Sequence, residues 1–220
     1  MDAALQCGTK WMCLKDCFRL KGTLGQCFCQ TMYEAEGMRL HHEENICSLV
    51  FIEIWDEPGK KRTGELRCSD TSAQLENKIM EYLSSRRRKK DEVPHYITFY
   101  SDQNKLFRSK LRPGKTGFGI HTVDASQGLD SKGHALLSMG RRHGVGFLSD
   151  IRRLIVSLSR SQKSTIMIVH SSVVNTNHPV ACVFQALRKI AQRSEAYVLL
   201  TNKNTKHSSA VVQQTLQKTN

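Results

Sequence analysis

From about residue 46 onward, short apolar stretches alternate with amphipathic ones, and this alternation restricts the possible folds more than any other feature. The stretch CSLVFIEIW (47–55) is continuously apolar and rich in β-branched residues, which is typical of a strand covered on both faces. The same kind of pattern predicts further strands over 95–100, 119–123, 134–139, 165–169 and 197–200.

Helices are predicted between these strands, because apolar residues recur there at helical spacing. They cover 69–90, 101–111 and 149–159, and a last helix begins at 177–179 with an apolar face of Val180, Val183, Phe184, Leu187 and Ile190. Repeated strand–helix alternation predicts a single α/β domain with a mainly parallel sheet and helices on both faces. In this architecture, ligands gather at the carboxyl ends of the strands.

The chain divides into three parts by composition. We expect a cysteine-rich lead-in over 1–45, the α/β domain over 46–200 and a polar, disordered tail over 201–220. The lead-in contains Cys7, Cys13, Cys17, Cys27 and Cys29. Only the Cys13–Cys17 spacing approaches that of a zinc site, and the adjacent His41 and His42 fit a surface position better than a ligand set. We therefore expect reduced thiols and no metal site.

The charge balance favours a polyanionic partner. The chain has 33 Lys and Arg against 20 Asp and Glu, a net charge of +13. Nucleic acid is the first candidate and an anionic membrane surface the second, while simple solubility is the alternative reading. Because no membrane-spanning run, secretory signal or basic amphipathic anchor is evident, we expect an intracellular protein, cytoplasmic or nuclear, without a membrane partner.

Two short segments imitate parts of a nucleotide hydrolase. PGKT (113–116) resembles the end of a P-loop, but Ser109 replaces the first glycine, and a predicted helix precedes it where a strand is required. WDE (55–57) ends a strand as a magnesium-binding acid pair would, but it comes before the apparent P-loop instead of after it. We interpret the first as a plain loop and the second as a solvated strand end.

Arg160 stands where the helix predicted over 149–159 meets the strand predicted over 165–169. A permanently charged side chain at a partly buried junction costs stability unless it has a partner. That partner is either a carboxylate of the chain, such as Asp124 or Asp150, or a ligand.

Two long motifs around Arg160 resemble a known family. TVDASQGLD (122–130) and GFLSDIRRLIVSLSRS (146–161) are similar to motifs V and VI of superfamily 1 helicases, and ITFYSDQ (97–103) is similar to their I-T-P-Y-x-x-Q element. CFRLKGTLGQCFCQTMY (17–33) fits their Q-Y-R-M-H-P segment less closely. The resemblance covers most of 17–200 and points to the second RecA-like lobe, as in the nonsense-mediated-decay RNA helicase family.

The resemblance implies roles for particular residues. Arg160 would be the motif VI arginine finger on the γ-phosphate of ATP, and Arg19 a second arginine reaching the same phosphate. The residues implied to line the nucleotide are Gln127, Gly128, Asp130 and Arg153. The residues implied to contact nucleic acid are Thr122, Lys115, Arg141 and Arg142. ATP with Mg²⁺ would bind only together with a complementary first lobe, because we find no P-loop in this sequence.

Several residues depart from the family pattern. They are Asp130 for Glu, Ile155 for Asn, Ser157 for Ala, Phe99 for Pro and Lys21–Gly22 for His-Pro. These changes indicate relaxed constraint on nucleotide handling.

Three functional hypotheses follow. The first is an isolated C-terminal motor lobe of an ATP-dependent RNA or DNA helicase, from a fragment or a truncated paralogue, with no ATPase activity of its own. RNA or single-stranded DNA would be its partner, together with a protein that supplies the first lobe. The second is a non-catalytic nucleic-acid-binding or adaptor module, and the third is a protein-interaction domain whose open lobe face docks a partner.

Overall fold

The computed structural model describes residues 15–32, 37–41, 47–55, 70–111, 117–140, 145–201 and 208–218. Within these ranges, six strands form one sheet in the order β5-β4-β6-β7-β3-β8, and each neighbouring pair is parallel. The strands are β3 (Leu49–Trp55), β4 (His95–Thr98), β5 (Gly119–Thr122), β6 (Ala135–Ser138), β7 (Thr165–His170) and β8 (Tyr197–Thr201). A separate two-stranded parallel sheet pairs β1 (Asp16–Cys17) with β2 (Arg39–Leu40).

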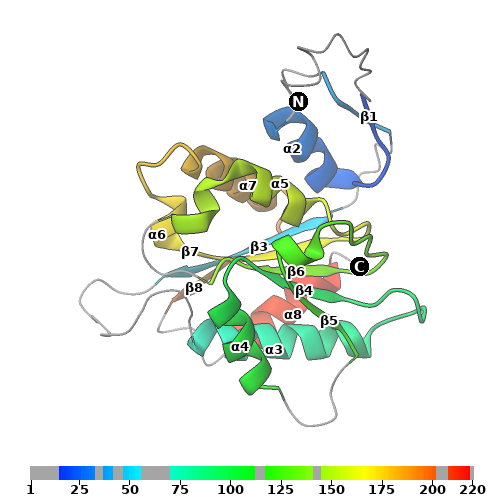
Figure 1. The fold of residues 1–220 in the computed structure, drawn as a ribbon, viewed down its shortest axis with the longest axis vertical. Coiled ribbons are helices and arrows are strands. Elements are labelled where there is room, and N and C mark those ends of the chain that lie inside the picture. The colour runs from blue at the N-terminus through cyan, green and yellow to red at the C-terminus, as the bar shows by residue number, and fades with distance from the viewer. Residues whose placement is uncertain are drawn as a thin grey trace.

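Helices cover both faces of the large sheet (Figure 1). One face carries α2 (Gly22–Met32), α5 (Ile151–Leu158), α6 (Ser171–Val174) and α7 (Ala181–Arg193). The other face carries α3 (Asp70–Ser85), α4 (Ser101–Ser109) and α8 (Ser208–Lys218). Two 3₁₀ turns, η1 (Asp124–Ser126) and η2 (Gly146–Ser149), lie in the connections before β6 and α5. The predicted α/β fold, with a parallel sheet and helices on both faces, is confirmed.

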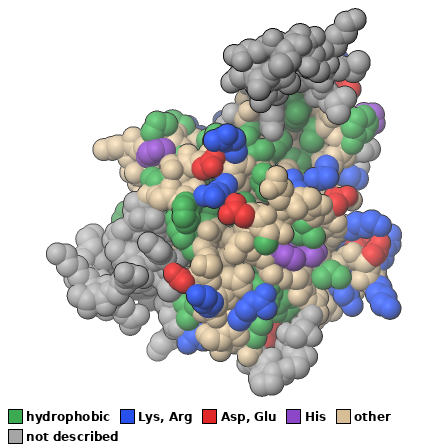
Figure 2. Space-filling model, in the orientation of Figure 1, with side chains coloured by type: hydrophobic (Ala, Val, Ile, Leu, Met, Phe, Trp, Pro, Cys, Tyr) green, Lys and Arg blue, Asp and Glu red, His purple; other side chains and the backbone are tan. Residues whose placement is uncertain are grey.

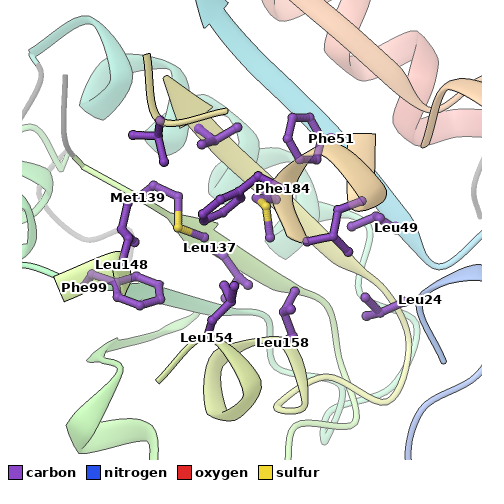
Figure 3. Close-up of a cluster of buried hydrophobic side chains, with 14 of the residues drawn as sticks. Leu24, Leu49, Phe51, Phe99, Leu137, Met139, Leu148, Leu154, Leu158 and Phe184 are labelled. Carbon is purple, nitrogen blue, oxygen red and sulfur yellow. The ribbon is translucent and has the colours of Figure 1, made fainter. Parts of the chain in front are cut away.

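The core above the sheet forms where the apolar faces of α2, α5 and α7 pack together with the strands. Leu154 and Leu158 of α5 point toward Leu137 of β6, and Phe184 of α7 lies in the same cluster (Figure 3). All four side chains are buried. The spacing of Leu154 and Leu158 places both on one helix face, as the sequence pattern predicts. This packing fixes α5, and therefore the residue that follows it, against the sheet.

The core below the sheet includes a helix that we did not predict. Val212 and Leu216 of α8 are buried against α3 and the sheet. The expectation of a disordered tail is therefore wrong for residues 208–218. Two apolar side chains one turn apart give α8 a narrow buried stripe, which is enough to dock an otherwise polar helix.

The amino ends of the central strands are tied together at one edge of the sheet. A parallel bridge joins Ser131 to Ser161, four residues before the first pairing of β6 with β7. The amide N–H of Thr165, the first residue of β7, donates to the carbonyl of Ser48, which immediately precedes β3 (2.8 Å). We call this side of the sheet the amino edge, and the side where the strands end the carboxyl edge.

The element order can be compared with the two segments, PGKT and WDE, that resemble parts of a nucleotide hydrolase. Helix α4 precedes PGKT and β5 follows it, which is the reverse of the order that a P-loop needs. Residues 112–116 themselves, and the two acids of WDE, lie outside the described residues.

Candidate functional site

Helix α5 delivers Arg160 to the amino edge. Its N-terminus is capped by Asp150, whose Oδ1 accepts a hydrogen bond from the backbone N–H of Arg152 (3.0 Å). The helix then crosses the sheet and ends at Leu158. Because Leu154 and Leu158 are fully buried, the position of Arg160 two residues later is set by core packing.

Oxygens of neutral groups hold the guanidinium of Arg160. Its Nε donates to the carbonyl of Val156 (2.8 Å), its Nη1 to the carbonyl of Leu129 (3.2 Å) and its Nη2 to Oγ of Ser159 (2.8 Å). The Val156 carbonyl belongs to the last turn of α5, where carbonyls lack helical partners and favour a cation. Arginine has five N–H donors, and the described chain provides acceptors for three of them.

A second arginine reaches the same place from the other end of the chain. Nε of Arg19 lies 3.2 Å from Oδ1 of Asp130, and its Nη1 donates to the carbonyl of Ser159 (3.4 Å). Gln162 donates from Nε2 to both carboxylate oxygens of Asp130 (2.9 and 3.0 Å). We call Arg19, Asp130, Arg160 and Gln162 the arginine cluster.

Ser48 anchors the segment that carries Arg19. Its Oγ accepts from the backbone N–H of Leu24 (2.9 Å) and donates to the carbonyl of Lys21 (2.6 Å). In return, Oγ1 of Thr23 accepts from the backbone N–H of Ser48 (3.1 Å). These bonds join the first turn of α2 to the amino end of β3, so that Arg19, just before the helix, lies at the amino edge.

The electrostatics of the cluster favour an anionic ligand. Burial lowers the pKa of Arg160, the charge of Arg19 lowers it further, and Asp130 acts in the opposite direction. The two guanidinium groups thus repel each other, and the carboxylate of Asp130, ion-paired with Arg19, acts against this repulsion. A group with several anionic oxygens would relieve this repulsion and accept the remaining N–H donors, and a phosphate has that chemistry.

Arg160 does not form the internal salt bridges that we considered as alternatives. Asp124 pairs instead with Arg153, which donates from Nε and Nη2 to its two oxygens (3.1 and 3.4 Å). Asp150 pairs with Arg152 (3.5 Å). The guanidinium of Arg153 also lies 4.9 Å from the centre of the Phe147 ring.

Of the other predicted site residues, three are among the described residues and three are not. Gln127 and Gly128 are exposed in the turn between η1 and Leu129, where Gly128 adopts the left-handed φ of 84° that favours glycine. Thr122 ends β5 at the carboxyl edge, and its Oγ1 accepts from the backbone N–H of Ala125 (3.3 Å). Lys115, Arg141 and Arg142 lie outside the described residues. The structure therefore brings Arg19, Asp130 and Arg160 together at the amino edge. Arg153 and Thr122 lie away from this cluster.

Three neighbours of the cluster were not singled out from the sequence. Ser159 directly precedes Arg160, and Gln162 follows it by two residues. Only this closeness in the sequence could have indicated a role for them. Phe18, next to Arg19, is 59% exposed, with its ring centre 4.3 Å from that of His41. An exposed aromatic ring beside an arginine is a signal that sequence reading could have used.

The residues that depart from the helicase pattern have structural roles here. Ile155 packs against the upper core, and Phe99 is buried in it. Ser157 is buried, and its Oγ donates to the carbonyl of Leu154 (2.9 Å). Among the described residues, none of these three side chains forms a hydrogen bond or ion pair with a side chain of the arginine cluster, although the backbone N–H of Arg160 donates to the carbonyl of Ser157 (3.4 Å).

The described residues contain neither a metal-ligand cluster nor a membrane-spanning helix. In the described ranges, no group of three or more His, Cys, Asp or Glu side chains is placed to hold a metal ion. Among the described helices, none is long and apolar enough to cross a membrane.

The six-stranded parallel sheet, covered by helices on both faces and carrying paired arginines at one edge, defines a RecA-like α/β domain. A family profile described as an AAA domain matches residues 14–172. The chain belongs to this family, the AAA-like C-terminal lobe of superfamily 1 helicases. Among curated proteins, no match to the chain reaches significance.

Proposed function

We propose that this domain acts as the second motor lobe of a superfamily 1 helicase resembling the nonsense-mediated-decay RNA helicase. In this role, Arg160 and Arg19 donate to the γ-phosphate of ATP held mainly by a first RecA-like lobe. The observation that carries the proposal is that two guanidinium groups lie together at the amino edge, Arg19 paired with Asp130 and Arg160 bonded to the carbonyl of the neighbouring Leu129. Rigid, permanently charged donors stabilise the charge on a transferring phosphoryl group.

The cluster fits the phosphates of ATP better than it fits Mg²⁺. Its donors are guanidinium N–H groups and the amide of Gln162, and Asp130 is its single carboxylate. A Mg²⁺ ion bound with ATP neutralises charge on the phosphates, and its protein ligands would belong to the first lobe. Within this chain, Gln127, Gly128 and Asp130 are the candidates to line the nucleotide, and Arg153 would join them only on leaving its ion pair with Asp124.

Nucleic acid would bind along the carboxyl edge. Thr122 ends β5 there, and Arg141 and Arg142 follow β6 in the sequence. Together with Lys115, these side chains would contact backbone phosphates of RNA or single-stranded DNA, and the net charge of +13 supports such contacts. Nucleotide and nucleic acid would then lie at opposite edges of one sheet, with α5 running between them.

The test is an ATPase assay of this chain combined with a first lobe from a superfamily 1 helicase, with and without single-stranded RNA. We expect no activity from the chain alone and RNA-stimulated activity from the pair. Arg160→Ala should lower that activity by about 10³-fold or more, the scale of a lost arginine finger. Arg160→Lys should not restore it, because an ammonium group cannot reproduce the planar fork.

Arg152→Ala is the matched control. Its side chain is 89% exposed and pairs with the Asp150 cap, so activity should change little. If the Arg160→Ala chain, combined with the first lobe, is as active as the Arg152→Ala chain combined with it, the proposal is wrong.

A second candidate is the non-catalytic nucleic-acid-binding or adaptor module. It is favoured by the ion pair of Asp130 with Arg19, because an arginine already paired with a carboxylate is less available to a phosphate. This candidate predicts RNA binding that falls steeply with salt, together with no ATPase activity from any pairing with a first lobe.

A further inference from the structure

Five consecutive basic residues follow helix α3: Arg86, Arg87, Arg88, Lys89 and Lys90. All five are exposed, and we call them the basic turn. The chain continues from this turn into β4, so the turn lies at the amino edge of the sheet. In Figure 2, lysine and arginine side chains gather at the right of the molecule, the side on which this connection lies in Figure 1.

The two acids that follow the basic turn do not neutralise it. Asp91 pairs with Lys132 (3.0 Å), and Glu92 pairs with Lys163 (3.4 Å). Both lysines belong to other segments, the loop after Asp130 and the loop after Arg160. The acids therefore hold the chain after the turn against these loops. Apart from a weaker interaction of Asp91 with Lys89, they leave the positive charge of the turn uncompensated.

The arginines of the turn have no carboxylate partner within the described part of the chain. Arg86 places its guanidinium 5.6 Å from the centre of the Tyr82 ring, and no ion pair is found for Arg87 or Arg88. A cation near the end of a helix interacts favourably with the helix dipole, but this effect fades beyond the last turn. This effect can explain a positive charge at Arg86, next to the end of α3, but not at Arg87 to Lys90.

Glu92 and Val93, which follow the basic turn, are packed closely against the loop that contacts Arg160. Gly133 allows this approach, because a Cβ there would lie 2.6 Å from the carbonyl oxygen of Val93. Oγ of Ser131 donates to the same carbonyl (3.3 Å), and the N–H of Ser131 donates to the carbonyl of Arg160 (3.0 Å). The turn and the arginine cluster are thus parts of one edge.

We propose that the basic turn binds the sugar–phosphate backbone of nucleic acid at the amino edge, separately from the contacts expected at the carboxyl edge. Guanidinium groups match phosphate oxygens in geometry and charge, and three consecutive arginines offer several such contacts. Arg86 already lies over the Tyr82 ring, which makes this ring a poor platform for base stacking. Binding at this surface is independent of base sequence and applies to single strands and duplexes.

The test compares the salt dependence of binding between variants, using a fluorescently labelled oligouridine and a labelled duplex. The variant carries Arg86→Ala, Arg87→Ala and Arg88→Ala together. The slope of log K against log salt is negative, and each lost phosphate contact reduces its magnitude by about 0.7 for a single strand and 0.9 for a duplex. We expect the magnitude of the slope to decrease by about 2 for the oligouridine and by slightly more for the duplex.

The control loses the same charge elsewhere. Lys78, Lys105 and Lys189 are exposed on α3, α4 and α7, and their joint replacement by alanine should change the slope far less. Circular dichroism melting of both triple variants confirms that each remains folded. Equal slopes in the two triple variants would overturn the proposal, as would binding to phosphatidylserine vesicles without binding to either nucleic acid.

This result is independent of the ATPase test. An inactive pairing with a first lobe would contradict the motor-lobe function without affecting the slope comparison. Unchanged slopes would remove the second nucleic-acid surface while leaving the role of Arg160 open to its own assay.

Discussion

Asp130 holds Arg19 at 3.2 Å while its two oxygens also accept from Gln162, so one carboxylate ties together three segments of the chain. The side chains of Arg19 and Asp130 are 40% and 50% exposed, and an ion pair with this exposure contributes little to stability. Its stronger effect is on ligand binding, because Asp130 competes with any anion for Arg19.

Asp130→Asn should therefore tighten the binding of inorganic triphosphate. The substitution removes the competing negative charge and leaves an amide oxygen to accept from Gln162. A half-exposed ion pair is worth roughly 0.2–1 kcal/mol, so the gain in affinity should reach up to about fivefold. Isothermal calorimetry at low salt measures it. Asp102→Asn, on the exposed surface of α4, changes the net charge equally and should leave the affinity nearly unchanged. Equal affinities in the two variants would contradict the competition.

The role of Arg153 can be decided by comparing stability with activity. Its ion pair with Asp124 predicts a coupling of about 0.3–1 kcal/mol in a double-mutant cycle of Arg153→Ala and Asp124→Asn, measured by urea unfolding. If Arg153 also lines the nucleotide, Arg153→Ala lowers the ATPase activity of the two-lobe pair by at least tenfold, whereas Asp124→Asn does not. A loss of the same size in both variants would assign Arg153 to structure alone.

The architecture was predictable from the sequence because it depends on local periodicity. The run 47–55 contains β3, because a strand buried on both faces gives a continuous apolar run. In 149–159, Leu154 and Leu158 are buried as their spacing predicts, whereas Ile151 in the first turn of α5 is exposed. The last predicted helix starts slightly later than expected, at Ala181, but Val180, Phe184 and Leu187 are buried as predicted.

The arginine cluster was only partly predictable. The motif resemblance singled out Arg160, Arg19 and Asp130, but the hydrogen bonds of Arg160 go to carbonyls of Val156 and Leu129, and carbonyls have no sequence signature. Arg153 was grouped with the nucleotide because it shares a motif with Arg160. The structure separates them because α5 carries the two side chains toward opposite edges of the sheet.

Helix α8 was missed because its apolar stripe is narrow. Leu216 is 2% exposed, and its replacement by alanine should destabilise the domain by about 2–4 kcal/mol, the usual cost of a truncated buried leucine. Gln214→Ala, on the exposed side of the same helix, should cost less than about 0.5 kcal/mol. Urea unfolding of the full chain measures both. A small effect of Leu216→Ala would show that α8 contributes little to the stability of the sheet.

Glu76 lies fully buried on α3 beneath the sheet and accepts four hydrogen bonds. The donors are Oγ of Ser72, the hydroxyl of Tyr96 (2.9 Å), Nε2 of Gln103 (2.9 Å) and Oγ of Ser138 (2.6 Å). Burial raises the pKa of Glu76, although these hydrogen bonds act in the opposite direction. The folded state therefore holds a proton on this carboxyl more tightly than the unfolded chain does.

The consequence is a stability that depends on pH with a defined sign. The contribution of this proton is complete below the usual glutamate pKa near 4.5 and is lost as the pH rises through the raised value. Relative to wild type, Glu76→Gln should gain stability as the pH increases from 5 toward 8, because the amide is never charged. Glu76→Ala should cost about 3 kcal/mol or more at every pH, since it leaves several buried donors without an acceptor. Urea unfolding at several pH values measures all three proteins, and a constant difference between wild type and Glu76→Gln would show that Glu76 keeps one protonation state throughout this range.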